Sequence, residues 1–309
     1  MSLPSTTASN SPGSIPVGSA LAGNIVRQRR NRLLQRFLRH RLAVVSLLFL
    51  VLVLIFTFPL AASLAPADPN RIDLRAIGKA PSSGHPLGTD MTGRDLLSRL
   101  VYGGRISMAV GIVAVSIYIS LGTLLGSIAG YYGGRVDTII MRLTEIVMAF
   151  PTLIILITIV AVIGPGLFNA MIAIGLIGWT GIARLVRGQI LSLRETDFVT
   201  AARATGVSQW RTLLRHILPN IVAPIIVAAT FGIAGAILTE AGLSFLGLGI
   251  KPPTPSWGNM INEAQQLNII ENKPWLWLAP GLMITLSVLA INFIGDGLRD
   301  ALDPRMTLD

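Results

Sequence analysis

Six long apolar blocks, separated by polar segments, constrain this chain more than any other feature. Each block is long enough to cross a hydrocarbon core of ~30 Å as a helix of about 20 residues. The chain is also 52% hydrophobic and only 13% charged, which is too apolar for an ordinary soluble domain. We therefore predict an all-α membrane protein with six transmembrane helices, over Leu42 to Leu64, Ile106 to Ala129, Ile146 to Ile163, Leu167 to Ala183, Ile221 to Thr239 and Trp275 to Ile294.

The distribution of arginine and lysine sets the predicted orientation, because basic residues are retained preferentially on the cytoplasmic side of a membrane. With the N-terminus inside, cytoplasmic segments hold 17 of the 25 basic residues and outside segments hold 8, so both termini are predicted to be cytoplasmic. A cleaved signal peptide is the weaker explanation of the first block, because a signal peptide has a shorter apolar run close to the N-terminus. Residues 1–41 are predicted to be a cytoplasmic tail, disordered over residues 1–24 and basic after them, ahead of a transmembrane domain over residues 42–309.

The most informative connection is the predicted cytoplasmic segment over residues 184–220. Its first half predicts a helix with small residues on one face, ended by Gly206 in the C′ position. Its second half predicts an amphipathic helix capped by Ser208 and stopped by Pro219. Such a pair suits either a partner protein or the surface of an anionic lipid layer. The two faces consist of Phe198, Ala201, Ala202 and Thr205, and of Trp210, Leu213, Leu214 and Ile217.

The same segment resembles the EAA loop of permease subunits in binding-protein-dependent ABC importers. The resemblance rests on Ala201-Ala202-Arg203-Ala204-Thr205-Gly206 and on His216-Ile217-Leu218-Pro219-Asn220. Further motifs, in order over roughly residues 30–306, are similar to the C-type permease of the dipeptide, oligopeptide and nickel branch. They are His85-Pro86-Leu87-Gly88-Thr89-Asp90, Gly93-Arg94-Asp95, Gly130-Tyr131-Tyr132-Gly133-Gly134, Ala149-Phe150-Pro151, Arg184-Leu185-Val186-Arg187-Gly188, Leu243-Ser244-Phe245-Leu246-Gly247-Leu248-Gly249, Pro255-Ser256-Trp257-Gly258 and Gly295-Asp296-Gly297-Leu298-Arg299-Asp300-Ala301-Leu302-Asp303-Pro304.

The resemblance implies a type I ABC importer permease fold and a multi-pass protein of a bacterial or archaeal cytoplasmic (inner) membrane. It also implies a homologous sister permease, two ATP-binding subunits that hold ATP and Mg, and an extracytoplasmic solute-binding protein. The implied solutes are dipeptides or oligopeptides, with nickel or another small solute as the alternative. An ion-coupled secondary transporter is the less favoured class, because the spans contain few acids and no detectable inverted repeat.

The resemblance further implies which residues couple the permease to its ATPases. Thr200 stands where the family has Glu, so a charge-assisted contact to the ATPase is absent at that position. Docking is then expected to rest on shape, backbone and apolar contacts. The implied coupling residues are Thr200, Ala201, Ala202, Gly206, Trp210, Arg211, Leu213, Leu214, Leu218 and Pro219.

Several kinds of chemistry are excluded by what the sequence lacks. There is no G-x-x-x-x-G-K-[ST] motif to hold ATP phosphates, so the chain is not expected to be an enzyme, and no catalytic residue is assigned. The chain has no cysteine, and His40, His85 and His216 lie far apart, so no metal site is predicted. Its basic residues lie between apolar blocks, which argues against nucleic acid as a partner.

Acidic residues near the predicted spans allow two interpretations each. Glu145 and Glu240 could face the solute pathway and contact a peptide amine or a cation. Alternatively, each lies at a membrane interface and pairs with an arginine, as Glu145 could with Arg142 one turn earlier.

The predicted outside segments carry the remaining candidates. Asp90, Arg94 and Asp95 could contact the solute receptor or could stabilise their own loop. Three tryptophans flank the last span, where indole rings commonly anchor at the lipid headgroups. Consecutive G-x-x-x-G steps in the second span predict close packing of another helix. These tryptophans are Trp257, Trp275 and Trp277, and the glycines are Gly122, Gly126 and Gly130.

Overall fold

The computed structural model describes residues 34–302, and regular structure within that range is helical apart from one isolated bridge between Thr89 and Asp95. Four helices are long and apolar enough to cross a membrane, which confirms an all-helical membrane architecture. The disordered tail predicted over residues 1–24 lies outside the described residues. The four helices are α4 (Leu96–Tyr132), α7 (Leu167–Leu193), the continuous helix Gln209–Phe245 and α13 (Trp275–Leu302).

The first predicted span is shorter than the apolar block that suggested it. α2 (Arg41–Thr57) has 17 residues, and only one further turn follows in α3 (Ala61–Leu64). A helix of that length rises about 25 Å, which is less than a hydrocarbon core of ~30 Å. Pro59 ends α2, because proline lacks an N–H and disfavours helical backbone in the residue before it. Arg105 then donates hydrogen bonds to the last carbonyl groups, including 3.1 Å to the oxygen of Thr57.

The third predicted span is divided into two helices. α5 (Gly134–Met148) and α6 (Thr152–Ile163) meet at an angle of 87°. Pro151 lies at this bend. Like Pro59, it lacks an N–H and disfavours helical backbone in the residue before it, so the helix is interrupted here. The predicted span over Ile146 to Ile163 is therefore not a single continuous helix. By length and composition the described residues contain four spans, or five if the bent pair counts as one.

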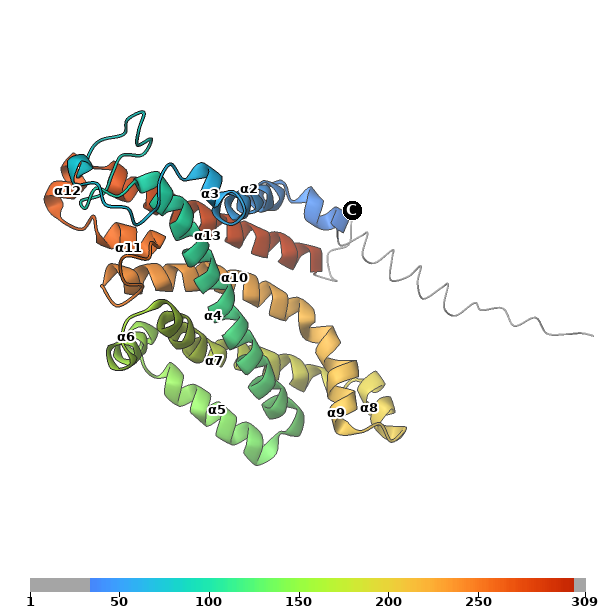
Figure 1. Cartoon of the computed structure of the whole chain (residues 1–309). Coiled ribbons are helices and arrows are strands. Elements are labelled where there is room, and N and C mark those ends of the chain that lie inside the picture. The colour runs from blue at the N-terminus through green and yellow to red at the C-terminus, as the bar shows by residue number, and fades with distance from the viewer. Residues whose placement is uncertain (1–33, 303–309) are drawn as a thin grey trace, which may run out of the picture.

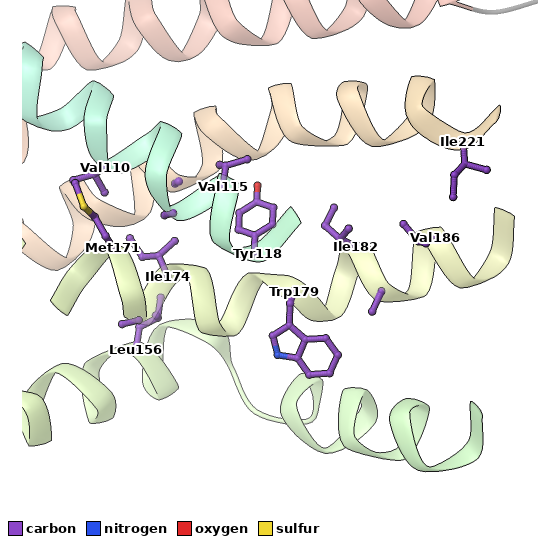
Figure 2. Packing of buried hydrophobic residues seen from close by; sticks show 14 of the residues in the cluster. Val110, Val115, Tyr118, Leu156, Met171, Ile174, Trp179, Ile182, Val186 and Ile221 are labelled. Carbon is purple, nitrogen blue, oxygen red and sulfur yellow. The ribbon is translucent and has the colours of Figure 1, made fainter. Parts of the chain in front are cut away.

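α4 is the central helix of the fold and packs along α7 (Figure 1). A Cβ atom on Gly126 would lie 2.5 Å from the carbonyl oxygen of Ala183, and a Cβ atom on Gly130 would lie 3.0 Å from that of Arg187. Gly122 is packed as tightly, so the predicted role of these glycines in helix packing is confirmed. The buried cluster around this contact includes Val110, Val115, Tyr118, Ile174, Trp179 and Ile182 (Figure 2).

The short helices gather at opposite ends of the long ones (Figure 1). α8 (Asp197–Ala204) and α9 (Gln209–Thr212) lie at one end, and α11 (Trp257–Asn262) and α12 (Leu267–Asn272) lie at the other. The segment between α3 and α4, with its single 3₁₀ turn η1 (Leu74–Ala76), joins the second group. The predicted cytoplasmic segment and the predicted outside segments are therefore separated by the length of the bundle.

Candidate coupling and solute-pathway sites

The predicted glycine turn after α8 is confirmed. Gly206 has a φ of +77°, a left-handed conformation that side chains with a Cβ adopt only with strain. The N–H of Val207 donates to the carbonyl oxygen of Ala202 at 3.3 Å, the bond across six residues that typifies a helix ended by a C′ glycine. Val199 is fully buried and holds α8 against the rest of the chain.

The second cytoplasmic helix does not end at Pro219. α9 continues through a π-helical turn, η2 (Leu213–Ile217), into α10 (Leu218–Phe245), so the helix runs without a break into the membrane. A π turn widens the helix by one residue and so gives space to a proline ring that would otherwise meet the preceding turn. Ser208 occupies the N-cap position, but its side chain accepts no capping hydrogen bond. The predicted start of this helix at Ser208 is therefore confirmed without the predicted side-chain cap, whereas its predicted end at Pro219 is wrong.

Burial divides the predicted coupling residues into two groups. Leu213 and Ile217 face the core, whereas Trp210 and Leu214 are each more than half exposed. The Trp210 ring lies edge-on to Tyr132 at the end of α4, with ring centroids 6.2 Å apart. The exposed predicted coupling residues are Thr200, Ala201, Gly206, Trp210, Arg211, Leu214 and Pro219, while Ala202 and Leu218 are partly buried and Leu213 is buried.

Glu145 pairs with Arg142, as one of its two interpretations predicted. The Nη1 atom of Arg142 lies 2.9 Å from Oε2 of Glu145, and both side chains are more than half exposed.

Glu240 takes neither of its predicted arrangements. Its side chain is fully buried, and its carboxylate oxygens accept hydrogen bonds from three serine hydroxyls rather than from an arginine. Ser244 donates at 2.7 Å, Ser256 at 2.9 Å and Ser107 at 3.3 Å. Each serine oxygen in turn accepts a backbone N–H, as Ser107 does from Trp257 at 3.1 Å. Glu240 therefore joins α4, α10 and the start of α11.

Asp90, Arg94 and Asp95 are buried and stabilise their own loop, so their side chains are not available to a receptor in this structure. Arg94 donates from Nε to Oδ2 of Asp90 at 2.6 Å and from Nη2 to Oε1 of Glu263 at 3.0 Å. Arg99, which is fully buried, also donates to Oε1 of Glu263 at 3.0 Å. Asp95 caps α4 by accepting the N–H of Ser98 at 2.7 Å.

These four charged side chains, Asp90, Arg94, Arg99 and Glu263, tie the segment before α4 to the end of α11. Burial alone would raise the pKa of Asp90, but the N–H and guanidinium of Arg94 and the hydroxyl of Thr92 outweigh it, so this pKa lies below its ordinary value of 3.8. Glu263 could not be connected with residues 90–99 from local patterns in the chain, because the pairing spans more than 160 positions.

Trp257 is not a membrane anchor. Its side chain is fully buried, and its indole N–H donates to the carbonyl oxygen of Leu100 at 2.9 Å. Gly104 provides the space, since a Cβ atom there would lie 2.8 Å from the indole ring. Trp275 and Trp277 remain partly exposed near the start of α13.

Comparison with known proteins identifies the family. Residues 122–308 match the binding-protein-dependent transport system inner membrane component, and residues 30–81 match the N-terminal transmembrane domain of oligopeptide transport permease C. The chain belongs to the binding-protein-dependent transport permeases. It is accordingly the transmembrane permease component of an ABC transporter and not the ATPase subunit.

Relatives of this permease are similar over nearly their whole length. The dipeptide transport system permease protein DppC of Alkalihalophilus pseudofirmus is 46% identical, covering 87% of this chain and 87% of the relative. The glutathione transport system permease protein GsiD of Pectobacterium atrosepticum is 44% identical, covering 88% and 90%. The oligopeptide transport system permease protein OppC of Haemophilus influenzae is 43% identical, covering 88% and 87%.

A solved structure shares the fold. A chain of the MetNI methionine ABC transporter, in an inward-facing conformation, superposes with a TM-score of 0.54 at 19% identity, covering 66% of this chain and 97% of that chain. At this identity the similarity concerns the fold alone.

Proposed function

We propose that this permease forms half of the translocation pathway of an importer for dipeptides or oligopeptides. The observation that carries the proposal is the near full-length similarity to permeases named for dipeptide, glutathione and oligopeptide transport, three solutes that share the peptide bond. The match of residues 30–81 to the N-terminal domain of oligopeptide transport permease C supports the same branch. Nickel or another small solute is the alternative within that branch.

The proposed assembly contains a homologous sister permease, two ATPase subunits that bind ATP and Mg, and an extracytoplasmic solute-binding protein. We propose that the protein lies in a bacterial or archaeal cytoplasmic membrane with six spans, in which α2 and the bent pair α5 and α6 complete the four long helices. Residues 1–41 then form the cytoplasmic tail and residues 42–309 the permease domain. Both termini face the cytoplasm, on the side of α8 and α9.

Coupling is proposed to occur through the exposed surface of α8 and α9. Thr200, Ala201 and Gly206 are exposed and have small side chains or none, so an ATPase can approach the backbone closely. Trp210 and Leu214 offer apolar contacts beside them. Because Thr200 replaces an acidic residue, this contact depends on shape rather than on a charge pair.

The continuous helix from α9 through α10 suits the transmission of movement. A displacement of Trp210 by an ATPase would act on one helix that runs to Phe245 at the far end of the bundle. There Glu240 holds α10 to α4 and α11 through its serines. ATP-driven closure of the ATPases would thus shift the outer end of α10 together with the cytoplasmic end of the same continuous helix, as alternating access requires.

The substrate is tested on the binding protein that accompanies this permease. Calorimetric titration with dialanine, with trialanine, with glutathione and with Ni²⁺ separates the solutes of this branch. The proposal expects saturable binding of a peptide and no binding of the bare metal ion. Binding of Ni²⁺ without any peptide would replace it with the nickel alternative.

A further inference from the structure

A polar groove of about 570 Å³ lies at the end of the bundle that carries α11, between the segment after α3, the beginning of α4 and the loop before α11. Its lining includes two side chains of opposite charge, Arg105 of α4 and Asp68 of the segment after α3. Within residues 34–302 neither of them forms an ion pair, with one another or with any other group. The groove therefore presents a cation and an anion whose charges the described chain does not neutralise.

Arg105 is held in place but keeps hydrogen-bond donors in reserve. Its Nε atom donates to the carbonyl oxygen of Thr57 at 3.1 Å, and its Nη2 atom donates to that of Phe58 at 2.8 Å. Its Cζ atom lies 5.4 Å from the ring centroid of Phe58 and 5.3 Å from that of Tyr102. These contacts use two of the five N–H groups of a guanidinium, and none of them supplies a full negative charge. The guanidinium is therefore oriented, with donors left for a phosphate or a carboxylate.

Asp68 is oriented in a similar way. Its Oδ1 atom accepts the N–H of Asn70 at 2.7 Å, and its side chain is exposed. No residue of the described range donates a hydrogen bond to its Oδ2 atom. A carboxylate oxygen in this state suits a primary ammonium group, which carries three N–H donors. The groove thus matches a ligand that carries an anion and an ammonium together.

The groove lies at the depth of a phospholipid headgroup. Arg105 contacts the end of α2, where the surface is apolar and Ile55, Phe56 and Phe58 are exposed. α2 rises about 25 Å, which is less than a hydrocarbon core of ~30 Å. A lipid beside so short a helix must draw its headgroup inward, and the groove offers polar partners at that place.

We propose that this groove binds the zwitterionic headgroup of phosphatidylethanolamine, with its phosphodiester on Arg105 and its ammonium on Asp68. The acyl chains then pack along the exposed apolar side of α2. Phosphatidylglycerol has no ammonium for Asp68, and the quaternary ammonium of phosphatidylcholine has no N–H to donate. With both termini cytoplasmic, as in the proposed orientation, the lipid belongs to the outer leaflet. It would add a second link between the end of α2 and α4.

Native mass spectrometry of the purified full chain, released from detergent micelles, measures this binding. The chain is titrated separately with dioleoyl phosphatidylethanolamine, phosphatidylglycerol and phosphatidylcholine, and we expect the ethanolamine lipid to bind most tightly. Arg105→Gln should weaken its binding about tenfold, and Asp68→Asn should weaken it about two- to fivefold, as expected for an exposed ion pair. Arg75→Gln and Asp73→Asn are the matched controls, because they remove exposed charges of the same outer segment outside the groove. Both controls should bind the lipid as the unmodified chain does.

Asp68→Asn keeps the test decisive even if Arg105→Gln does not fold. Arg105 holds the end of α2 through two hydrogen bonds, whereas the side chain of Asp68 is exposed. Equal binding of the three lipids by the unmodified chain would overturn the inference. An unchanged preference for the ethanolamine lipid in Asp68→Asn, or an equal loss in Asp73→Asn, would overturn it as well.

Two soluble competitors distinguish the lipid from other zwitterions. Glycerophosphoethanolamine carries the same headgroup without acyl chains, and trialanine carries an ammonium and a carboxylate. We expect neither compound to displace the lipid when present at the same concentration. Displacement by glycerophosphoethanolamine would assign the groove to a soluble phosphodiester, and displacement by trialanine would assign it to a peptide. Either result would refute a lipid site.

Discussion

Replacing Gly126 with alanine tests the packing of α4 against α7 most sharply. The new Cβ atom would lie 2.5 Å from the carbonyl oxygen of Ala183, 2.9 Å from its Cα and 3.0 Å from Cβ of Val186. Two of these three atoms are backbone, so no side-chain rotation relieves the overlap. The helices must separate by about 0.5 to 1 Å, which sacrifices a quarter to a half of the attraction at each nearby contact.

The magnitude follows from two opposed effects. Overpacking of this kind costs about 1 to 3 kcal/mol of unfolding free energy. Gly188→Ala is the matched control, because it lies inside α7 with no atom within 4 Å of its Cβ position. The control should be stabilised by up to about 1 kcal/mol, since alanine favours a helix more than glycine does. Both alanines gain this helix preference, so we expect the two variants to differ by the overpacking cost, about 1 to 3 kcal/mol.

Unfolding by SDS in mixed micelles, followed by tryptophan fluorescence, measures this difference on the purified chain. Gly126→Ala should unfold at a lower fraction of SDS than the unmodified protein, and Gly188→Ala at an equal or higher fraction. If Gly126→Ala were as stable as Gly188→Ala, the close approach of α4 and α7 would not be a determinant of the fold.

Three further predictions concern the two ends of the bundle. Gly206→Leu should uncouple ATP hydrolysis from peptide uptake, whereas Gly206→Asn should retain coupling because asparagine tolerates a positive φ. Normal substrate-stimulated hydrolysis in the leucine variant would contradict this role of Gly206. Glu240→Leu should lower the unfolding free energy by about 1 to 3 kcal/mol for each serine hydroxyl left without an acceptor. Glu240→Gln should lower the unfolding free energy less, because one side-chain oxygen remains as an acceptor, and equal decreases in the two variants would refute the serine arrangement. Because the pKa of Asp90 is lowered in the folded protein, its stabilisation is present above its ordinary pKa of 3.8 and is lost as the pH falls through the lower value. Unfolding of Asp90→Asn should therefore depend less on pH below about 4, and an unchanged pH profile would exclude this role.

Local features of the fold were predictable from the sequence. Gly206 ends α8 as its position after an amphipathic run indicated, and the spacing of Gly122, Gly126 and Gly130 indicated a helix contact that α7 provides. Such features depend on backbone conformation and on residue size within a few turns. Proline was harder to interpret, since Pro151 bends a span whereas Pro219 lies in a helix that continues through a π turn.

Features that depend on distant residues were not predictable. Glu240 looked like a pathway or interface residue because Ser107 and Ser256 approach it only in the folded bundle. Arg94 looked available to a receptor because Glu263, its partner, lies far along the chain. Without the partner in view, a charged residue in a polar loop is naturally assigned to the surface. One local pattern in this region was visible in the sequence. Ser256 stands three residues before Asn259, which is the spacing of a capping box, and this box starts α11.

The most direct test of the central claim is to purify the tagged chain from its native membranes in mild detergent and to identify the proteins that accompany it by mass spectrometry. The account predicts a second multi-span permease and ATPase subunits that carry P-loops. The ATPase subunits should be lost when Trp210 and Leu214 are replaced by charged residues. Recovery of the chain alone, from a preparation in which another ABC transporter stays assembled, would contradict the account and would favour an ion-coupled carrier whose α8 and α9 lie on lipid.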